Sequence, residues 1–379
     1  MSPLRKRKEV SRTISAAPAA GRLLEVTDLN TSFKTPRGLA RAVNNVSFVL
    51  DRGKTLGIVG ESGSGKSVLS RSIMGLLPKQ NVVREGSVRF EGSEITHHSN
   101  SAMRAFWGTE MAMVFQDPMT SLNPVLKVGR QITESLRYHL DMDRQQASET
   151  ALALLKSVGI PEAERRLAEY PHQLSGGMRQ RIVIAIALAC GPKLLFADEP
   201  TTALDVTVQA QILNLLQQQQ RERDMAMVLV THDLGVVAGR ADEIAVMYSG
   251  QIVERAPTRT LFAHMRMPYT EGLLKSIPKL EQPSHSRLQI IGGRPPDLVS
   301  PPPGCKFAPR CPYAQEKCHI EEPPLVEAET PGHYFKCWYP VGTDAGKEAL
   351  ERNLAAGLPQ ALAAVAGDAR AAAEVELGV

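Results

Sequence analysis

The chain has 379 residues, of which 43% are hydrophobic and 22% charged, a composition typical of a folded globular protein rather than a disordered chain. Its net charge of +4 is close to neutral, which does not suggest a nucleic-acid-binding protein. The longest apolar run, Ile182 to Cys190, is far shorter than the ~20 residues that span a bilayer. We therefore expect a protein of the cytosol that reaches a membrane only through a partner.

The N-terminal part of the chain changes character at residue 22. Residues 1–21 are basic and rich in small residues, and we favour a flexible tail over a membrane-binding or signal segment. Short apolar segments typical of β-strands follow at 23–29, 43–50, 55–60, 112–116, 194–198 and 226–232.

Helix-like stretches lie between several of these segments. Residues 143–159 place Ala147, Ala151, Leu155 and Val158 on one helical face, and the glycine at 159 suits the end of that helix. Apolar strands that alternate with helices predict a mostly parallel sheet covered on both faces.

The segment GESGSGKS, residues 60–67, follows the strand TLGIV and fits the P-loop pattern. Its glycines let successive backbone N–H groups point at nucleotide phosphates, and the next helix adds the positive end of its dipole. Lys66 would reach the β- and γ-phosphates, and the Ser67 hydroxyl would bind Mg²⁺. A simple glycine-rich turn is the weaker alternative, because an apolar helix follows. We expect the nucleotide to contact Gly60, Ser62, Gly63, Gly65, Lys66 and Ser67.

The strand LLFADEP, residues 194–200, ends in two adjacent carboxylates. Isolated charges are costly inside a buried strand, so two acids at its carboxyl end point to chemistry rather than packing. Asp198 would hold Mg²⁺, and Glu199 would polarise the water that attacks the γ-phosphate. The alternative, a strand that simply runs out into solvent, loses weight beside a P-loop.

The segment LSGGMRQR, residues 174–181, opens an apolar helix. Ser175 fits the position of a helix N-cap, while Gly176 and Gly177 permit close backbone approach. The P-loop already has a helix N-terminus of its own for the phosphates. We therefore expect this second terminus to face a nucleotide held by another subunit.

The C-terminal part has a different texture, and we predict units at 22–279, 280–340 and 341–379. Residues 295–304 are proline-rich and lead into four cysteines, Cys305, Cys311, Cys318 and Cys337. Their spacing lacks the usual zinc knuckle and differs from common ferredoxin spacings, so zinc and iron–sulfur both stay open. Because the segment has few large apolar residues, metal binding would hold it folded. The Ala-rich tail from 341 is expected to be weakly helical or disordered.

Taken together, the motifs resemble an ABC-type ATPase over roughly residues 22–275. GESGSGKS, the glutamine of VFQDP (Gln116), LSGGM, FADEP, the ALD of Ala203–Asp205 and VTHD with His232 occur in the order and spacing of that family. The resemblance implies an α/β P-loop NTPase fold: a mostly parallel sheet with helices, an antiparallel β subdomain, a helical subdomain and, here, a small Cys-rich C-terminal domain.

The same resemblance implies roles for single residues. ATP would lie between the P-loop of one subunit and the LSGG of another, with Gln116 sensing the metal and contacting a membrane partner. His232 would contact the γ-phosphate, and Asp205 would communicate across the dimer. Phe33 matches the aromatic that stacks on adenine, although an ordinary core or edge-strand aromatic is the alternative.

A narrower resemblance leads to the ATP-binding subunits of dipeptide and oligopeptide permeases. It is carried by DEPTTALDVTVQAQIL, QDPMTSLNPV, YPHQLSGGMRQR, THDLGVVA, MPYTEGLLKSIPKL and GCKFAPRCPYAQEKC. In that family the four cysteines look like a [4Fe–4S] site. The resemblance also implies the partners: a homologous second ATPase, two membrane permease subunits and an extracytoplasmic binding protein.

The predicted function is therefore the ATP-hydrolysing motor of an importer for di- or oligopeptides, bound peripherally at the cytoplasmic face of the inner membrane. Nickel or another small solute is an alternative cargo, because this subunit does not touch the cargo. A soluble ABC ATPase that acts on nucleic acid or in iron–sulfur assembly is the rival from another class. The chain lacks the tandem cassettes, coiled-coil insertion and basic patches of such proteins.

Overall fold

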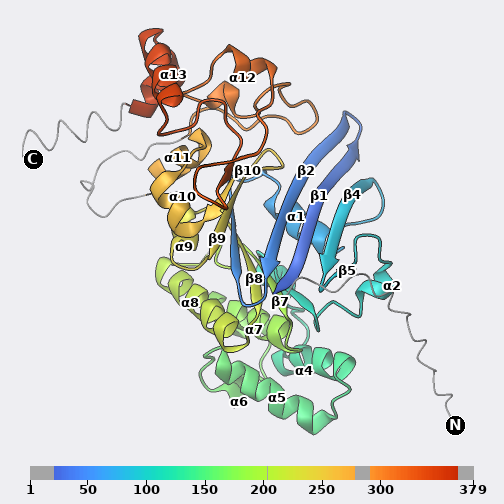
Figure 1. The fold of residues 1–379 in the computed structure, drawn as a ribbon. Helices are drawn as coiled ribbons and strands as arrows, with labels where there is room; N and C mark the ends of the chain where they lie inside the picture. The colour runs from blue at the N-terminus through green and yellow to red at the C-terminus, as the bar shows by residue number, and fades with distance from the viewer. Residues whose placement is uncertain (1–20, 203, 278–290, 366–379) are drawn as a thin grey trace, which may run out of the picture.

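The computed structural model of the chain describes residues 21–202, 204–277 and 291–365. Two β-sheets lie at its centre, with helices around them (Figure 1). The smaller sheet has the strand order β2-β1-β4-β5 and is antiparallel throughout. Its strands are β1 (Arg22–Thr35), β2 (Gly38–Asp51), β4 (Val82–Phe90) and β5 (Ser93–Glu94). This sheet is the antiparallel subdomain that the family resemblance implied.

The larger sheet has the order β11-β12-β10-β9-β3-β8-β7-β6. Its centre is parallel, whereas β10 and the strands beyond it are antiparallel. Every residue of β3, β7 and β8 is buried, as expected for parallel strands covered on both faces. The strands are β3 (Thr55–Val59), β6 (Met111–Val114), β7 (Leu194–Asp198), β8 (Ala226–Thr231), β9 (Glu243–Tyr248), β10 (Gln251–Pro257), β11 (Val326–Glu327) and β12 (Tyr334–Phe335).

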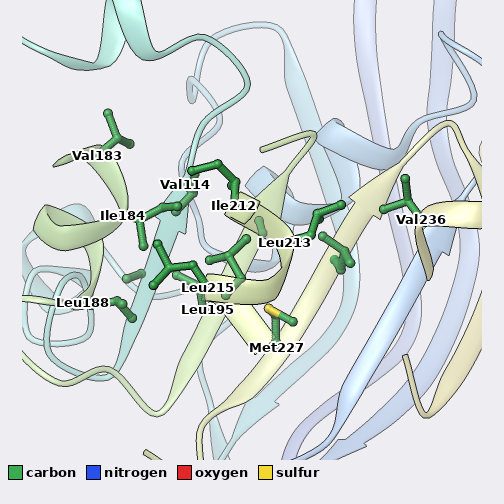
Figure 2. Close-up of a cluster of buried hydrophobic side chains, with 14 of the residues drawn as sticks. Val114, Val183, Ile184, Leu188, Leu195, Ile212, Leu213, Leu215, Met227 and Val236 are labelled. Atoms are coloured by element: carbon green, nitrogen blue, oxygen red, sulfur yellow. The ribbon is translucent and has the colours of Figure 1, made fainter. Parts of the chain in front are cut away.

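Alternate residues of the parallel strands enter two different cores. In β8, Met227 and Leu229 pack on one face, and Val228 and Val230 on the other. The first core lies under helices, where side chains of β6, β7 and β8 meet those of α7, α8 and α9 (Figure 2). The second lies between the two sheets and also holds side chains of α1. The helices are α1 (Lys66–Ile73), α7 (Gly176–Leu188), α8 (Val206–Glu222), α9 (Leu234–Ala238), α10 (Thr258–His264) and α11 (Pro268–Lys275).

A helical lobe lies at the end of the molecule farthest from the C-terminal helices, below α7 in Figure 1. The predicted helix at 143–159 is observed as α5, and the capping box of Asp143 and Gln146 explains where it begins. Its four predicted apolar residues are all fully buried. The lobe contains α4 (Val128–His139), α5 (Arg144–Ser157) and α6 (Ala163–Arg166). The remaining helices between β5 and α7 are α2 (Asn100–Met103), α3 (Pro118–Ser121) and the 3₁₀ turn η1 (Pro171–Gln173).

The Cys-rich segment continues the main fold, so the structure does not confirm a separate small domain. Strand β12 pairs with β10 and thereby extends the larger sheet. Phe307 belongs to the first core, the one under the helices. Glu254 of β10 contacts His333 at 2.8 Å, with both side chains buried. The segment thus has apolar and polar anchors that its composition did not reveal. It also contains η2 (Ala308–Arg310) and α12 (Glu316–Ile320).

The tail from residue 341 was expected to be weakly helical or disordered. Residues 344–355 form the helix α13 (Asp344–Ala355), capped by the Thr343 hydroxyl. Asn353 is buried and donates hydrogen bonds to the carbonyls of Pro312 and Ala314, which ties α13 to the Cys-rich segment. Tertiary contacts therefore stabilise a helix that is weak by itself.

Several predictions fall wholly or partly outside the described residues. They concern the basic tail at 1–20, residue Ala203, the boundary near 280 and the chain beyond 365. Of the helices that the structure describes, none combines the length and the apolar character needed to cross a membrane.

Candidate active site

The P-loop lies between the carboxyl end of β3 and the start of α1. Gly65 has a φ of 103°, and a Cβ there would lie 2.2 Å from the carbonyl oxygen of Ala42, so only glycine fits. Gly63 has a φ of 81°, and a Cβ there would meet no atom within 4 Å. Because no side chain caps α1, the loop presents free backbone N–H groups at the positive end of the helix. This geometry suits an anion.

Lys66 is held at the base of the loop. Its side chain is only 4% exposed, and Nζ donates hydrogen bonds to the carbonyls of Gly60 at 2.7 Å and Glu61 at 3.0 Å. Burial lowers the pKa of Lys66, although Glu199 and Asp198 oppose that shift. A desolvated ammonium group interacts more strongly with an anion than one in bulk water. Lys66 is therefore placed to bind a phosphate.

Two oxygen ligands meet where α1 begins and β7 ends. The Ser67 hydroxyl donates to Oδ1 of Asp198 at 2.8 Å. Oδ2 of Asp198 is buried and has no hydrogen-bond partner within the described part of the chain, and burial raises the pKa of this carboxyl. A buried carboxylate oxygen without a partner is costly unless a cation or water reaches it. The pair thus fits a Mg²⁺ ion, which prefers oxygen ligands and keeps several waters.

Several polar side chains lie around the carboxylate of Glu199, among them Gln116 and His232, which the sequence analysis assigned to the same site. Its Oε2 accepts hydrogen bonds from Gln116 Nε2 at 3.0 Å and from the Thr202 hydroxyl at 2.9 Å. His232 Nδ1 lies 3.5 Å from the same oxygen, and Lys66 Nζ lies 4.0 Å from Oε1. The structure therefore brings Gln116, Glu199 and His232 together from three separate strand ends.

Two features of Glu199 were not predicted. Its φ of 46° lies in the left-handed region, which costs of the order of 1 kcal/mol for a residue with a Cβ and is concentrated at functional sites. Thr202 holds its carboxylate, and a hydroxyl residue three positions after the acid was the available signal in the sequence. Both features fix the direction in which the carboxylate points.

The LSGG segment has the local geometry predicted for it. The Ser175 hydroxyl accepts from the N–H of Met178 at 3.3 Å and caps α7. A Cβ on Gly177 would lie 2.8 Å from Val208 of α8, so this glycine permits close packing of the two helices. Among the described residues, no hydrogen bond or ion pair joins Ser175, Gly176 or Gly177 to the P-loop. The segment does not complete the site of its own chain.

Asp205 and Phe33 occupy ordinary structural positions in the isolated chain. Asp205 caps α8, with Oδ1 accepting from the N–H of Val208 at 2.9 Å. Phe33 is a half-buried residue of β1, paired with Ala40 of β2 and Val82 of β4. Communication by Asp205 across a dimer and stacking of Phe33 on adenine stay predictions.

The four cysteines of the C-terminal segment line one small apolar pocket, together with residues such as Met267 and Tyr313. The backbone N–H of Cys305 donates to the carbonyl of Cys318 at 2.7 Å, which brings two turns of the segment together. Burial raises the pKa of all four thiols.

Within the described ranges, however, no group of three or more His, Cys, Asp or Glu side chains is arranged to hold a metal ion. The cysteines thus converge as predicted, but the structure does not confirm a metal centre.

Cys190 lies just after α7, at the end of the apolar run that begins at Ile182. It is half-buried against the first core, and its Sγ lies 3.7 Å from the carbonyl of Ser135.

Comparisons with known proteins agree with this geometry. Residues 43–202 match the ABC transporter family, and residues 253–318 match the oligopeptide/dipeptide transporter C-terminal region. The oligopeptide transport ATP-binding protein OppD of Bacillus subtilis is 52% identical over 318 residues, which are 84% of this chain and 88% of that protein. OppD of Salmonella typhimurium is 48% identical over 88% of this chain and 98% of its own length.

A solved dimeric structure of the ATP-binding cassette MJ0796, bound to ADP and phosphate, superposes with a TM-score of 0.57 at 28% identity. The match covers 62% of this chain and 99% of that cassette. Relatives of this identity and coverage establish the family: the chain belongs to the oligopeptide and dipeptide transport ATP-binding proteins of the ABC transporters.

Proposed function

We propose that this chain is the ATP-hydrolysing motor subunit of an importer for di- or oligopeptides. The observation that carries the proposal is the meeting of Gln116, Glu199 and His232 beside the Ser67–Asp198 pair and Lys66. Such a site has a cation for phosphates, oxygen ligands for Mg²⁺ and a carboxylate for water. The peptide cargo is supported by the relatives, which are named oligopeptide transport ATP-binding proteins.

The reaction is the hydrolysis of the γ-phosphate of ATP. The oxygen of a water bonds to the γ-phosphorus while the bond to the bridging oxygen breaks, giving ADP and inorganic phosphate. Glu199 orients that water and accepts its proton, and Lys66 stabilises the negative charge on the phosphate oxygens. Ser67 and Asp198 would hold Mg²⁺, which neutralises charge on the phosphates when bound. Gln116 and His232 both lie against the Glu199 carboxylate and position it. With nucleotide and Mg²⁺ bound, His232 would contact the γ-phosphate and Gln116 would contact the metal.

A second ATPase subunit completes each site. One support is the helix terminus at Ser175, which makes no contact with the P-loop of its own chain among the described residues. The other is the dimeric state described for the MJ0796 cassette. Gly176 and Gly177 would then face the nucleotide of the partner, with Asp205 beside them. We propose a homologous rather than an identical partner, as the resemblance to peptide permeases implies.

Membrane permease subunits are the proposed source of attachment to the cytoplasmic face of the membrane. Gln116 is flanked by exposed apolar side chains: Phe115 is 39% exposed, Met119 58% and Val125 76%. Exposed apolar residues grouped around one short helix suit a protein partner. Movement of a permease pair bound there would shift Gln116, whose side chain donates a hydrogen bond to Glu199. An extracytoplasmic binding protein that delivers the peptide belongs to the same proposal.

The experiment for this proposal is purification of the tagged full-length chain from membranes of its own cells, followed by identification of its partners. Two permease subunits and a second ATPase should co-purify. When the complex is placed in vesicles, uptake of labelled peptide should require ATP on the side of the membrane where this chain is bound. Co-purification without peptide uptake, but with uptake of nickel or another solute, would replace the cargo. A chain that never associates with permease subunits would contradict the motor role and favour a non-transport ATPase.

We further propose that the four cysteines hold a [4Fe–4S] cluster rather than zinc. Support comes from their common pocket and from the family resemblance. Thiolates are the ligands of such clusters, and binding would release the four thiol protons. About four irons and four sulfides per anaerobically purified chain, lost in Cys311→Ser, are expected. One zinc without sulfide, or neither metal in a folded chain, would overturn the assignment.

A further inference from the structure

Arg310 lies in the Cys-rich segment, directly before Cys311, and its side chain is only 3% exposed. All five of its guanidinium N–H groups have acceptors. Nη1 donates to Glu61 Oε2 at 2.7 Å and the Tyr248 hydroxyl at 3.2 Å, and Nη2 donates to Glu61 Oε1 at 2.8 Å. The remaining two reach the carbonyls of Gly292 at 2.8 Å and Ile291 at 3.1 Å. Full saturation of a buried arginine fixes its position and leaves it no freedom to reach another anion.

Glu61 is the P-loop residue that follows Gly60, and each part of it makes a different contact. Its carboxylate faces Arg310, and its backbone N–H donates to the Tyr269 hydroxyl at 2.8 Å. Its carbonyl accepts hydrogen bonds from Lys66 Nζ at 3.0 Å and from the Ser64 N–H at 3.2 Å. One residue thus connects the Cys-rich segment with the lysine of the ATP site.

An aromatic cluster holds this connection in place. The rings of Tyr248 and Tyr269 lie 4.6 Å apart, and that of Phe307 lies 5.3 Å from Tyr248 and 5.4 Å from Tyr269. The Arg310 guanidinium carbon is 5.8 Å from the ring of Tyr248 and 5.9 Å from that of Phe307. Since Phe307 and Arg310 belong to the same short stretch, the stretch is anchored to the sheet and the P-loop together.

We propose that Arg310 is a positioning residue of the ATP site: by pairing with Glu61 it keeps that carboxylate away from Lys66 and the phosphates. The inference rests on the proposed binding of ATP at the P-loop. Without Arg310, the partly buried carboxylate of Glu61 would lose its ion pair, while Lys66 remains bound to the backbone carbonyl of the same residue. Glu61 would then compete with the phosphates for Lys66 and repel their charge. The Cys-rich segment thus controls how strongly the P-loop binds ATP.

The test measures the Kd of the full-length chain for MgATP in Arg310→Met, Glu61→Gln and the double variant. Arg310→Met should raise the Kd about tenfold to a hundredfold, since removing one partner of a buried charge pair leaves the other uncompensated. The double variant should return to within about threefold of the unaltered chain, because the uncharged amide that replaces the Glu61 carboxylate no longer attracts Lys66. If Arg310 had a purely structural role, the added Glu61→Gln change would not restore ATP binding. An equal rise of the Kd in Arg310→Met and in the double variant would therefore overturn the proposal.

Three further variants keep the outcome decisive. Arg266→Met is the matched control, because Arg266 pairs with Glu329 in the same segment and does not contact the P-loop. Should Arg310→Met not fold, Arg310→Lys keeps the positive charge but loses the two-point contact with Glu61, so a smaller rise in Kd, relieved by Glu61→Gln, is expected there. Lys66→Ala separates the two proposals. If Lys66→Ala still binds ATP, the P-loop assignment fails; if it loses ATP while Arg310→Met binds normally, only the role of Arg310 fails.

Discussion

Glu199→Gln isolates the chemical role of the carboxylate from its structural role. The amide oxygen of glutamine can still accept the hydrogen bonds that Gln116 and the Thr202 hydroxyl donate to Oε2. Glutamine has nearly the same volume as glutamate, so the strained backbone at this position keeps its side-chain contacts. The variant therefore loses a proton acceptor and one negative charge, and little else.

The expected magnitude follows from these two losses. A positioned general base contributes about 10²- to 10⁴-fold to a rate, so kcat for ATP hydrolysis by the assembled complex should fall by at least about a hundredfold. The lost charge lies 4.0 Å from Lys66 Nζ and close to the site of the γ-phosphate. Its removal lessens repulsion of the nucleotide, so the Kd for MgATP should be unchanged or lower.

The assay is steady-state phosphate release by the assembled complex, with MgATP binding to the same preparation measured in parallel. Glu164→Gln is the control, because Glu164 is an exposed acid on the helical lobe that pairs with Lys156 at 2.7 Å. A kcat for Glu199→Gln within about threefold of the control would refute the assignment of Glu199 as the base. A fall in kcat accompanied by an equal loss of ATP binding would point to a structural role instead.

Three other predictions concern backbone geometry, stability and pH. Gly65→Ala should abolish ATP binding, because its Cβ would meet the Ala42 carbonyl at 2.2 Å. The control Gly191→Ala, with a φ of 66° and open space around it, should lower stability by only about 1–2 kcal/mol without weakening ATP binding. Equal Kd values for ATP in the two variants would contradict the first expectation. His333→Leu should lower the free energy of unfolding by about 1–3 kcal/mol, because it removes one hydrogen-bond partner of the buried Glu254 carboxylate while the backbone N–H groups of Arg266 and Met267 remain, and denaturant titration measures this. Burial raises the pKa of Glu243, so its contribution to stability is present below the usual glutamate pKa and is lost as the pH rises through the raised value. The unaltered chain should therefore lose stability relative to Glu243→Gln across that window, and parallel pH profiles of the two would refute this reasoning.

The motifs of the active site could be read from the sequence because each depends on local geometry. A glycine run between strand and helix, an acid pair at a strand end and a serine before a helix can each be recognised within a few residues of sequence. The structure accordingly pairs Ser67 with Asp198 at 2.8 Å and places Lys66 Nζ 4.0 Å from the Glu199 carboxylate. Parallel strands made this convergence predictable, since their carboxyl ends meet at one edge of the sheet.

Other features depended on contacts between distant segments. Arg310 and Glu61 are 249 residues apart, and neither lies in a pattern that marks the other as its partner. The pairing of β12 with β10 joins the Cys-rich segment to the main sheet through two residue pairs, too few to leave a strand signal in the sequence. Helix α13 was judged weak from its composition, but burial of Asn353 and its hydrogen bonds to the Cys-rich segment stabilise it.

The sequence by itself determined the family of folds, the order of the motifs and the chemistry of the nucleotide site. These properties follow from short-range backbone preferences and from the alternation of apolar strands with helices. Only the tertiary structure decided that the C-terminal segment is part of the main sheet and that its arginine pairs with the P-loop. Such contacts form where packing brings distant residues together, because a buried charge requires a partner at one place in space, whatever its distance along the chain.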